Sequence, residues 1–181
     1  MSADELSMTL PGLLPRLWRF AMRLAGNPAD ADDLVQRACV RALERRHQLI
    51  PGTAPLSWMY RIVHSVWMNE LRARRIRNRS SAQWTDELAE TIPDSSSPTP
   101  EMDLLHRQII TAVEGLPEAQ RTVMLLVAIE GFSYREAAEV LEVPVGTVMS
   151  RLARARLTVG QSFGNQKTEL NQKTELKGAA A

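Results

Sequence analysis

The chain has 181 residues, of which 44% are hydrophobic, 5% are aromatic and 24% are charged, with a formal net charge of +1. This length suffices for one large or two small domains, and the composition is that of a globular protein with a buried core. A single cysteine, Cys39, excludes an internal disulfide and gives no metal cluster. The longest apolar run, residues 122–129, is too short to span a bilayer, and residues 1–10 are acidic, so a cytoplasmic protein is expected.

Charge is distributed in blocks along the chain. Residues 1–79 carry thirteen Arg against seven Asp or Glu, a net charge of +6. Residues 80–103 carry six acids and no base, and in residues 104–163 six Arg balance six Glu. This asymmetry suggests contact with nucleic acid or another polyanion, although a solvated surface alone also produces such blocks.

An all-α fold is predicted, because no segment alternates between apolar and polar residues over more than a few positions. The first helix ends at Gly26, and Asn27 caps the next helix with Pro28 at its first position. A loop over residues 48–54 precedes a long helix from about Pro55 to Arg79. The predicted buried faces are Leu13, Leu14, Leu17, Trp18, Ala21 and Leu24 in the first helix, Ala31, Leu34, Val35, Ala38, Ala42 and Leu43 in the second, and Met59, Ile62, Val63, Val66 and Leu71 in the third.

A Ser- and Pro-rich segment, residues 80–100, predicts a flexible acidic linker between two small helical domains at residues 1–79 and 101–163. In the second domain, helices are expected near residues 102–113 and 117–130, the latter closed by Gly131. Residues 164–181 contain NQKTEL twice and are expected to be a disordered tail, either a cloning remnant or a natural variable segment.

The segment from Ser133 to Arg156 has the pattern of a helix-turn-helix. Ser133 and Glu136 form a capping box that starts the first helix, and Pro144 ends the turn and opens the second helix. Residues 145–160 contain no acid and three arginines, which suit guanine edges and phosphates in a major groove. An ordinary helical hairpin with a solvated basic face is the alternative.

Three segments in order carry a family resemblance: DADDLVQRACVRAL (30–43), SWMYRIVHSVWMNELRARRIR (57–77) and LPEAQRTVMLLVAIEGFSYREAAEVLEVPVGTVMSRLARAR (116–156). Over residues 10–162 the chain resembles the bacterial extracytoplasmic-function (ECF) sigma factors, the small two-domain class of the sigma-70 family. The resemblance implies that the first segment docks on the β′ clamp helices of core RNA polymerase, the second opens the −10 promoter element, and the third binds the −35 element. The acidic linker would then thread the channel that later carries RNA, or serve as a tether.

Two departures from the family pattern affect these surfaces. Arg37, Ala38 and Cys39 stand where many relatives carry Glu-Thr-Phe, so the docking surface differs in detail. Met149 stands where many relatives carry a basic residue, and it cannot donate a hydrogen bond to a base.

The resemblance assigns candidate residues to three surfaces. For the −10 element, a pocket for an unstacked base is expected beside the loop of residues 48–57, although Trp58 and Trp67 can equally be core residues. The arginines at the end of the same helix, Arg74 among them, are expected to meet backbone phosphates. The candidates are Thr147, Ser150, Arg151, Arg154 and Arg156 for −35; Trp58, Tyr60, Ser65, Asn69, Arg72 and Arg75 for −10; and Asp32, Asp33, Gln36, Arg37 and Arg41 for core polymerase.

The partners that the resemblance implies are core RNA polymerase, promoter DNA and an anti-sigma factor. Such anti-sigma factors are commonly anchored in a membrane, whereas no membrane insertion is expected for this chain.

A stand-alone helix-turn-helix regulator is the main alternative, and it would dimerise and bind DNA without polymerase. A nucleic-acid-modifying enzyme is less well supported, because His47, His64 and His106 are scattered and no nucleophile–base pair, phosphate-binding glycine loop or metal-ligand spacing is present. No enzyme activity, cofactor or metal is therefore expected. An adaptor that uses its basic surfaces for a protein partner is a further alternative.

Overall fold

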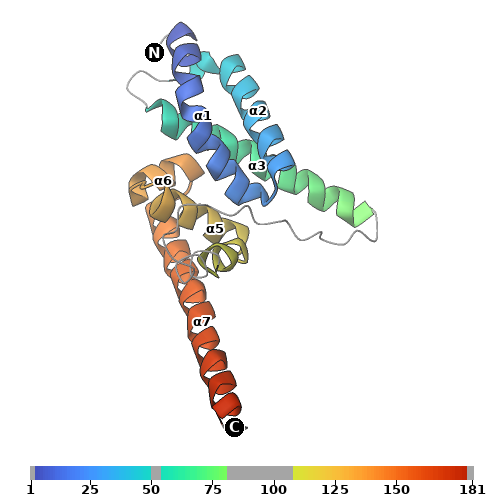
Figure 1. Cartoon of the computed structure of the whole chain (residues 1–181). Coiled ribbons are helices and arrows are strands. Elements are labelled where there is room, and N and C mark those ends of the chain that lie inside the picture. The colour runs from blue at the N-terminus through green and yellow to red at the C-terminus, as the bar shows by residue number, and fades with distance from the viewer. Residues whose placement is uncertain (1–2, 50–53, 81–107, 179–181) are drawn as a thin grey trace.

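The computed structural model describes residues 3–49, 54–80 and 108–178, and every regular element in these ranges is a helix (Figure 1). The all-α prediction is thus confirmed for them. The first unit contains α1 (Ala3–Ala25), α2 (Pro28–Glu44), the 3-10 helix η1 (Arg46–Gln48) and α3 (Pro55–Ser80). The second contains a helix at residues 108–114, α5 (Glu118–Met124), the π-helical turn η2 (Leu125–Ile129), α6 (Tyr134–Leu141) and α7 (Val145–Gly178).

The junction between α1 and α2 is encoded locally. Gly26 adopts a φ of 79°, a conformation that favours glycine, and its N–H donates to the carbonyl of Met22 at 2.8 Å. The side chain of Asn27 then accepts from the backbone N–H of Asp30 at 2.8 Å, and Pro28 occupies the first turn of α2. The predicted stop and restart are both confirmed.

The buried face of α1 differs from the prediction at its edges. The helix begins at Ala3, so that Leu6 and Leu10 also enter the core, and Phe20 is fully buried. Leu14 is 38% exposed, because at about 100° per residue it lies roughly 80° away from the stripe that contains Leu6. Its predicted burial is wrong.

The other two predicted faces of the first unit are largely correct. In α2 the core positions from Ala31 to Ala42 are buried, whereas Leu43 is 36% exposed at the end of the helix. In α3 the predicted residues are buried except for Leu71, which packs against the core while partly exposed. Cys39 is half-buried at the margin of the core, and burial raises the pKa of its thiol.

The helix-turn-helix forms as predicted. Ser133 accepts from the N–H of Glu136 at 3.2 Å, while the Glu136 carboxylate accepts from the N–H of Ser133 at 2.8 Å. Between α6 and α7, Glu142 adopts a left-handed φ of 55° that turns the chain toward Pro144. The capping box and the turn therefore set the start of α6 and the angle at which α7 leaves it.

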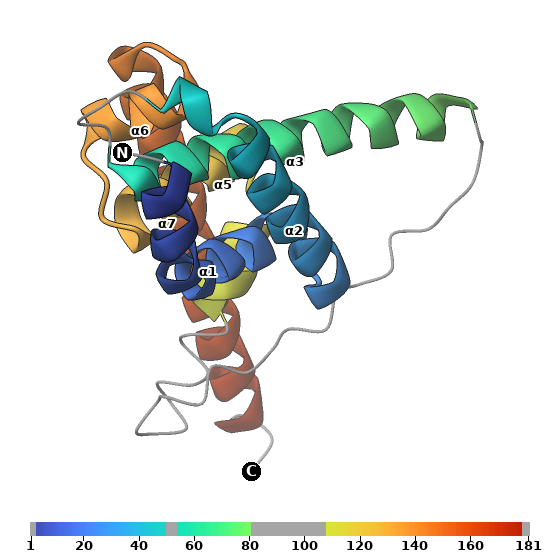
Figure 2. The same ribbon diagram turned by 90° about the horizontal axis from the view of Figure 1, so that it is seen from above.

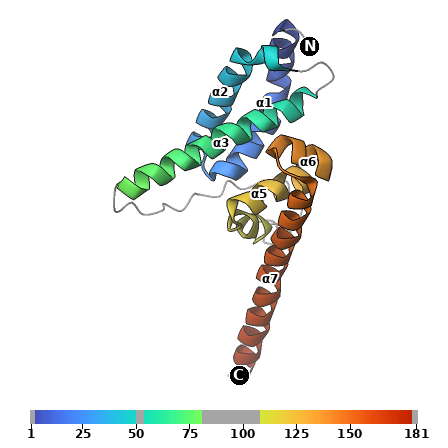
Figure 3. The ribbon, with the colours of Figure 1, turned by 180° about the vertical axis from the view of Figure 1, so that it is seen from behind.

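The last helix, α7, continues to Gly178 and projects from the rest of the molecule (Figures 1 and 3), while the expectation that residues 164–181 form a separate tail stays a prediction. Residues 165–177 are rich in Gln, Lys, Glu and Leu, which have high helix propensity. A helix already nucleated by a packed segment can propagate through such residues at little cost. A segment that cannot form a core can still extend a helix in this way.

The two units pack against each other through α3 with α6 and α1 with α5, and their buried residues form one continuous cluster. Seen from above, the C-terminal half of α3 extends beyond this body (Figure 2). The predicted linker at residues 81–100 and the start of the predicted helix at residues 102–107 lie outside the described residues. None of the helices in the described ranges is long and apolar enough to cross a membrane.

Candidate nucleic-acid interface

The proposed recognition helix, α7, is oriented by its apolar side. Val148, Leu152 and Ala155 are buried, and their spacing of four and three residues puts them on one helical face that packs against α5 and α6. The opposite face is consequently exposed and carries Ser150 and Arg154.

The five −35 candidates lie on one helix but differ in exposure. Ser150, Arg154 and Arg156 are exposed, while Thr147 and Arg151 are half-buried. The hydroxyl of Ser150 donates to the Thr147 carbonyl at 3.1 Å, an interaction that a base edge could replace. Met149 is 52% exposed among these polar groups, so an apolar contact is available on this face.

Four of the −10 candidates form an exposed stripe on α3. Ser65, Asn69, Arg72 and Arg75 are all exposed, at spacings of four, three and three residues. The Asn69 side-chain oxygen accepts from the Arg72 guanidinium at 2.9 Å. The structure thus brings a hydroxyl, an amide and two cations together along one side of the helix.

The aromatic −10 candidates are buried. Tyr60 is 0% exposed and Trp58 is 7% exposed, and Trp67 is 4% exposed. Of the two interpretations given for Trp58 and Trp67, the core position holds for both. Neither Trp58 nor Tyr60 can stack on a base in this conformation.

Glu70 gathers three arginines from α2 and α3. Its carboxylate accepts from Arg74 at 3.0 Å, Arg77 at 3.0 Å and Arg37 at 3.2 Å. These hydrogen bonds, that from Arg74 first, lower the pKa of Glu70 to about 2. Arg74 also pairs with Asp30 at 2.9 Å and lies 5.6 Å from the centre of the Trp67 ring. Arg74 therefore joins the two helices.

The polymerase candidates lie on the outer face of α2. Asp32, Asp33, Gln36 and Arg37 are exposed, and Arg41 is half-buried. Three of them are already paired: Asp32 accepts from the Trp18 indole at 2.7 Å, and Asp33 pairs with Arg37 at 2.9 Å. Beside them a groove of about 610 Å³ runs between α2 and α3, with lining residues that include the 56% exposed Val40.

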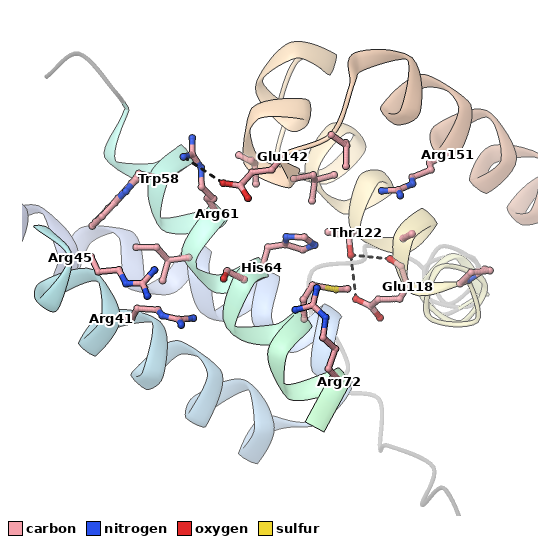
Figure 4. A pocket seen from close by; sticks show the side chains of 18 of the residues that line it. Arg41, Arg45, Trp58, Arg61, His64, Arg72, Glu118, Thr122, Glu142 and Arg151 are labelled. Atoms are coloured by element: carbon pink, nitrogen blue, oxygen red, sulfur yellow. Dashed lines mark hydrogen bonds and ion pairs between the residues drawn. The ribbon is translucent and has the colours of Figure 1, made fainter. Parts of the chain in front are cut away.

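A larger groove of about 890 Å³ lies between the two units (Figure 4). Arg61, His64 and Arg72 line it from α3, facing Glu142 and the Arg151 side chain of α7. Burial lowers the pKa of His64, an effect that the nearby Glu118 carboxylate opposes. The groove is predominantly basic: its other charged lining residues are Arg41, Arg45, Arg75 and Glu118.

Glu130 is the residue that sequence reasoning missed. It accepts from Tyr60 of α3 and pairs with Arg16 of α1 at 3.1 Å, so it connects the second unit to two helices of the first. One signal in the sequence was available, because an acidic residue at a helix C-terminus is unfavourable beside the helix dipole and needs a partner.

Comparison with known proteins matches both units separately. The family model "Sigma-70 region 2" matches residues 12–77, and "Sigma-70, region 4" matches residues 106–159. The ECF RNA polymerase sigma factor EcfG of Rhodopseudomonas palustris is 33% identical over 153 residues, which cover 84% of this chain and 82% of that protein. The ECF RNA polymerase sigma-E factor of Escherichia coli K12 is 32% identical over 134 residues, 70% of each chain.

Two solved structures have the same fold. The sigma factor RpoE of Bartonella quintana, solved with the anti-sigma factor NepR, aligns with a TM-score of 0.78 at 24% identity, over 89% of this chain and 98% of that one. CnrH, solved with the cytosolic domain of CnrY, aligns with a TM-score of 0.63 at 24% identity, over 91% and 90%.

Proposed function

Because the chain belongs to the ECF RNA polymerase sigma factors of the sigma-70 family, we propose that its two units divide promoter recognition between them. In this proposal α7 reads the −35 element, the exposed stripe of α3 acts on the −10 element, and the outer face of α2 docks on the β′ clamp helices of core polymerase. The work is binding and positioning, while the chemistry of RNA synthesis belongs to core polymerase.

The proposal depends mainly on one observation: α7, the second helix of the helix-turn-helix, exposes a basic face. Arg154 and Ser150 are exposed there because Val148, Leu152 and Ala155 anchor the opposite side. A helix held in this way can enter a major groove with its polar face toward base edges. The stand-alone regulator is disfavoured, since such a protein has no need for the unit that matches sigma-70 region 2 at residues 12–77.

For the −10 element, the proposal uses the four exposed residues of α3 and the two buried aromatic ones. Arg72 and Arg75 would meet backbone phosphates, and Ser65 and Asn69 would contact an unstacked base. Tyr60 can take part only after the second unit has moved away, because Phe132 of that unit packs against its ring, and Trp58 is buried in this conformation.

An anti-sigma factor is the proposed regulator. Two proteins of the same fold, RpoE of Bartonella quintana and CnrH, were solved with an anti-sigma factor and with the cytosolic domain of CnrY. The basic groove between the units offers an acidic partner six arginines within one surface: Arg41, Arg45, Arg61, Arg72, Arg75 and Arg151. Membrane anchoring of that partner is part of the proposal.

Transcription in vitro with purified core polymerase and a promoter library tests the function. We expect specific initiation that requires both proteins, and absence of core binding would refute the proposal. On a promoter selected in this way, Arg154→Ala should weaken recognition by about 1–3 kcal/mol if Arg154 makes a bidentate base contact. Arg19→Ala, an exposed arginine on α1, is the control. Unchanged promoter affinity of the Arg154 variant would remove that residue from the −35 contact.

A further inference from the structure

The carboxylate of Glu130 is buried at the contact between the two units. Its side chain is 7% exposed, and its Oε2 accepts from the Tyr60 hydroxyl and from Arg16 Nη2 at 3.1 Å. Arg16 also donates to the Glu130 carbonyl at 3.3 Å. A buried charge is costly unless it is paired, and both partners here belong to the other unit. The stability of this contact thus depends on the units staying together.

Aromatic packing surrounds the same point. The Tyr60 ring meets Phe20 of its own unit edge-on at 4.7 Å and Phe132 of the second unit at 5.2 Å. A second hydrogen bond, from the Trp67 indole to Glu118 at 2.6 Å, joins the units further along α3. Two part-buried polar contacts and an edge-on aromatic contact therefore hold α3 to the second unit.

The arginines that line the groove beside these contacts oppose the association of the two units. Arg61, Arg72 and Arg75 line the groove from α3. Arg151 of α7 lies on the opposite side from Arg61 and Arg72 (Figure 4). Like charges across a shared groove repel each other. Glu142 offsets part of this repulsion, with its carboxylate 4.0 Å from the Arg61 guanidinium, but the two side chains are 74% and 43% exposed and such a pair contributes little.

We propose that Glu130, Tyr60 and Arg16 form a latch that keeps the free protein in a closed conformation, in which the aromatic part of its promoter-opening surface is buried. This inference rests on the proposed function for the role of Tyr60 and Trp58, which are 0% and 7% exposed when the latch is closed. By their names, the −35 and −10 elements are about 25 base pairs apart, which is roughly 85 Å of B-DNA at 3.4 Å per base pair. Two units in direct contact cannot read both elements, so the latch must open before a promoter is used.

The distance between the units tests the latch without reference to DNA. Met8 and Leu157 are 83% and 63% exposed and lie on α1 and α7, so Met8→Cys and Leu157→Cys in a Cys39→Ser background accept a fluorescent dye pair. In single-molecule energy transfer on the full-length chain, Glu130→Ala and, separately, Arg16→Ala should move molecules from a compact to an extended population. Glu139→Ala and Arg19→Ala, exposed residues of the same charges, should not.

A charge swap separates the latch from a general loss of structure. The double variant Arg16→Glu with Glu130→Arg restores an ion pair of opposite orientation, and the Tyr60 hydroxyl can accept from the new arginine. Its compact population should exceed that of either single variant, with the same helical circular dichroism. Unchanged distances in both single alanine variants, or no recovery in the swap, would overturn the proposal.

Binding of single-stranded DNA tests the consequence of opening. With a dye-labelled oligonucleotide carrying the −10 strand of a promoter that the reconstituted polymerase uses, Glu130→Ala should bind at least roughly tenfold more tightly than wild type, if less than a tenth of the wild-type molecules are open. Opening without a gain in affinity would overturn the inhibitory role. The double variant Arg72→Ala with Arg75→Ala tests the −10 assignment independently, because these two arginines are exposed even when the latch is closed. If it binds as tightly as wild type, the proposed function fails at that surface, while the distances still decide the latch.

Discussion

Replacing Glu70 with Gln should destabilise the protein at neutral pH and leave it unchanged in strong acid. The Glu70 carboxylate, 16% exposed, accepts from three arginines, and one of them, Arg37, comes from α2. The introduced amide would keep an oxygen acceptor but lose the charge on which these bonds depend. The substitution therefore removes the Arg37–Glu70 ion pair between α2 and α3 while preserving the volume of the side chain.

The size of the effect follows from the pKa. The arginines, Arg74 first, lower the pKa of Glu70 from 4.5 to about 2, which corresponds to about 3 kcal/mol in favour of the folded state. Because Arg37 and Arg77 are 44% and 62% exposed, water and salt screen part of this interaction, and we expect about 1–2 kcal/mol. A lowered pKa stabilises the folded state fully above pH 4.5 and progressively less as the pH falls toward 2.

Urea unfolding, followed by circular dichroism at a series of pH values, measures the contribution of Glu70 to the free energy of unfolding. At pH 7 the Glu70→Gln variant should be less stable than wild type by the stated amount, and the difference should shrink between pH 4.5 and pH 2. Glu44→Gln, an exposed carboxylate at the end of α2, should show no such profile. A constant difference at every pH would refute the reasoning, since the loss would then come from packing or geometry and not from ionisation.

Two further substitutions test the helix-turn-helix. Ser133→Ala removes the side chain that caps α6 and should lower the free energy of unfolding by about 1 kcal/mol. Urea unfolding measures this loss, with Ser150→Ala as the control. No loss of stability would mean that the cap is dispensable. Glu142→Gly should raise the melting temperature, because a left-handed φ of 55° costs a residue with a side chain roughly 1 kcal/mol. Glu142→Ala, which keeps a side chain, should not raise it. A lower melting temperature for the glycine variant would show that the Arg61 contact outweighs this strain.

The features that sequence predicted well are those decided within a few residues. Asn27 and Pro28 start α2, Ser133 and Glu136 start α6, and Gly131, with a φ of 77°, ends the helical segment before it. Each of these signals is a hydrogen bond or a backbone conformation that the local side chain itself supplies. Such signals are readable without knowledge of the rest of the fold.

The features that sequence did not predict depend on contacts between distant segments. Glu130 looked like the polar end of an apolar helix, and only the approach of Arg16 and Tyr60, which are 114 and 70 residues away, makes it a buried contact. Arg74 was expected to face phosphates together with its neighbours, yet Asp30 of α2 pairs with it. The pattern of one helix defines a basic face, but the neighbouring helix decides which of its cations are already bound.

The candidate DNA contacts divide into two groups by exposure, and the division suggests an order of events. On α7, Ser150 and Arg154 are exposed while the units are in contact, so the closed protein retains an accessible part of its proposed −35 surface. On α3, Tyr60 is enclosed by Phe20 and by Phe132 of the second unit, so the aromatic part of the proposed −10 surface is absent until the units separate. If separation is driven by binding of core polymerase, strand opening is confined to the assembled enzyme, because the free protein lacks the aromatic part of the surface that would hold an unstacked base.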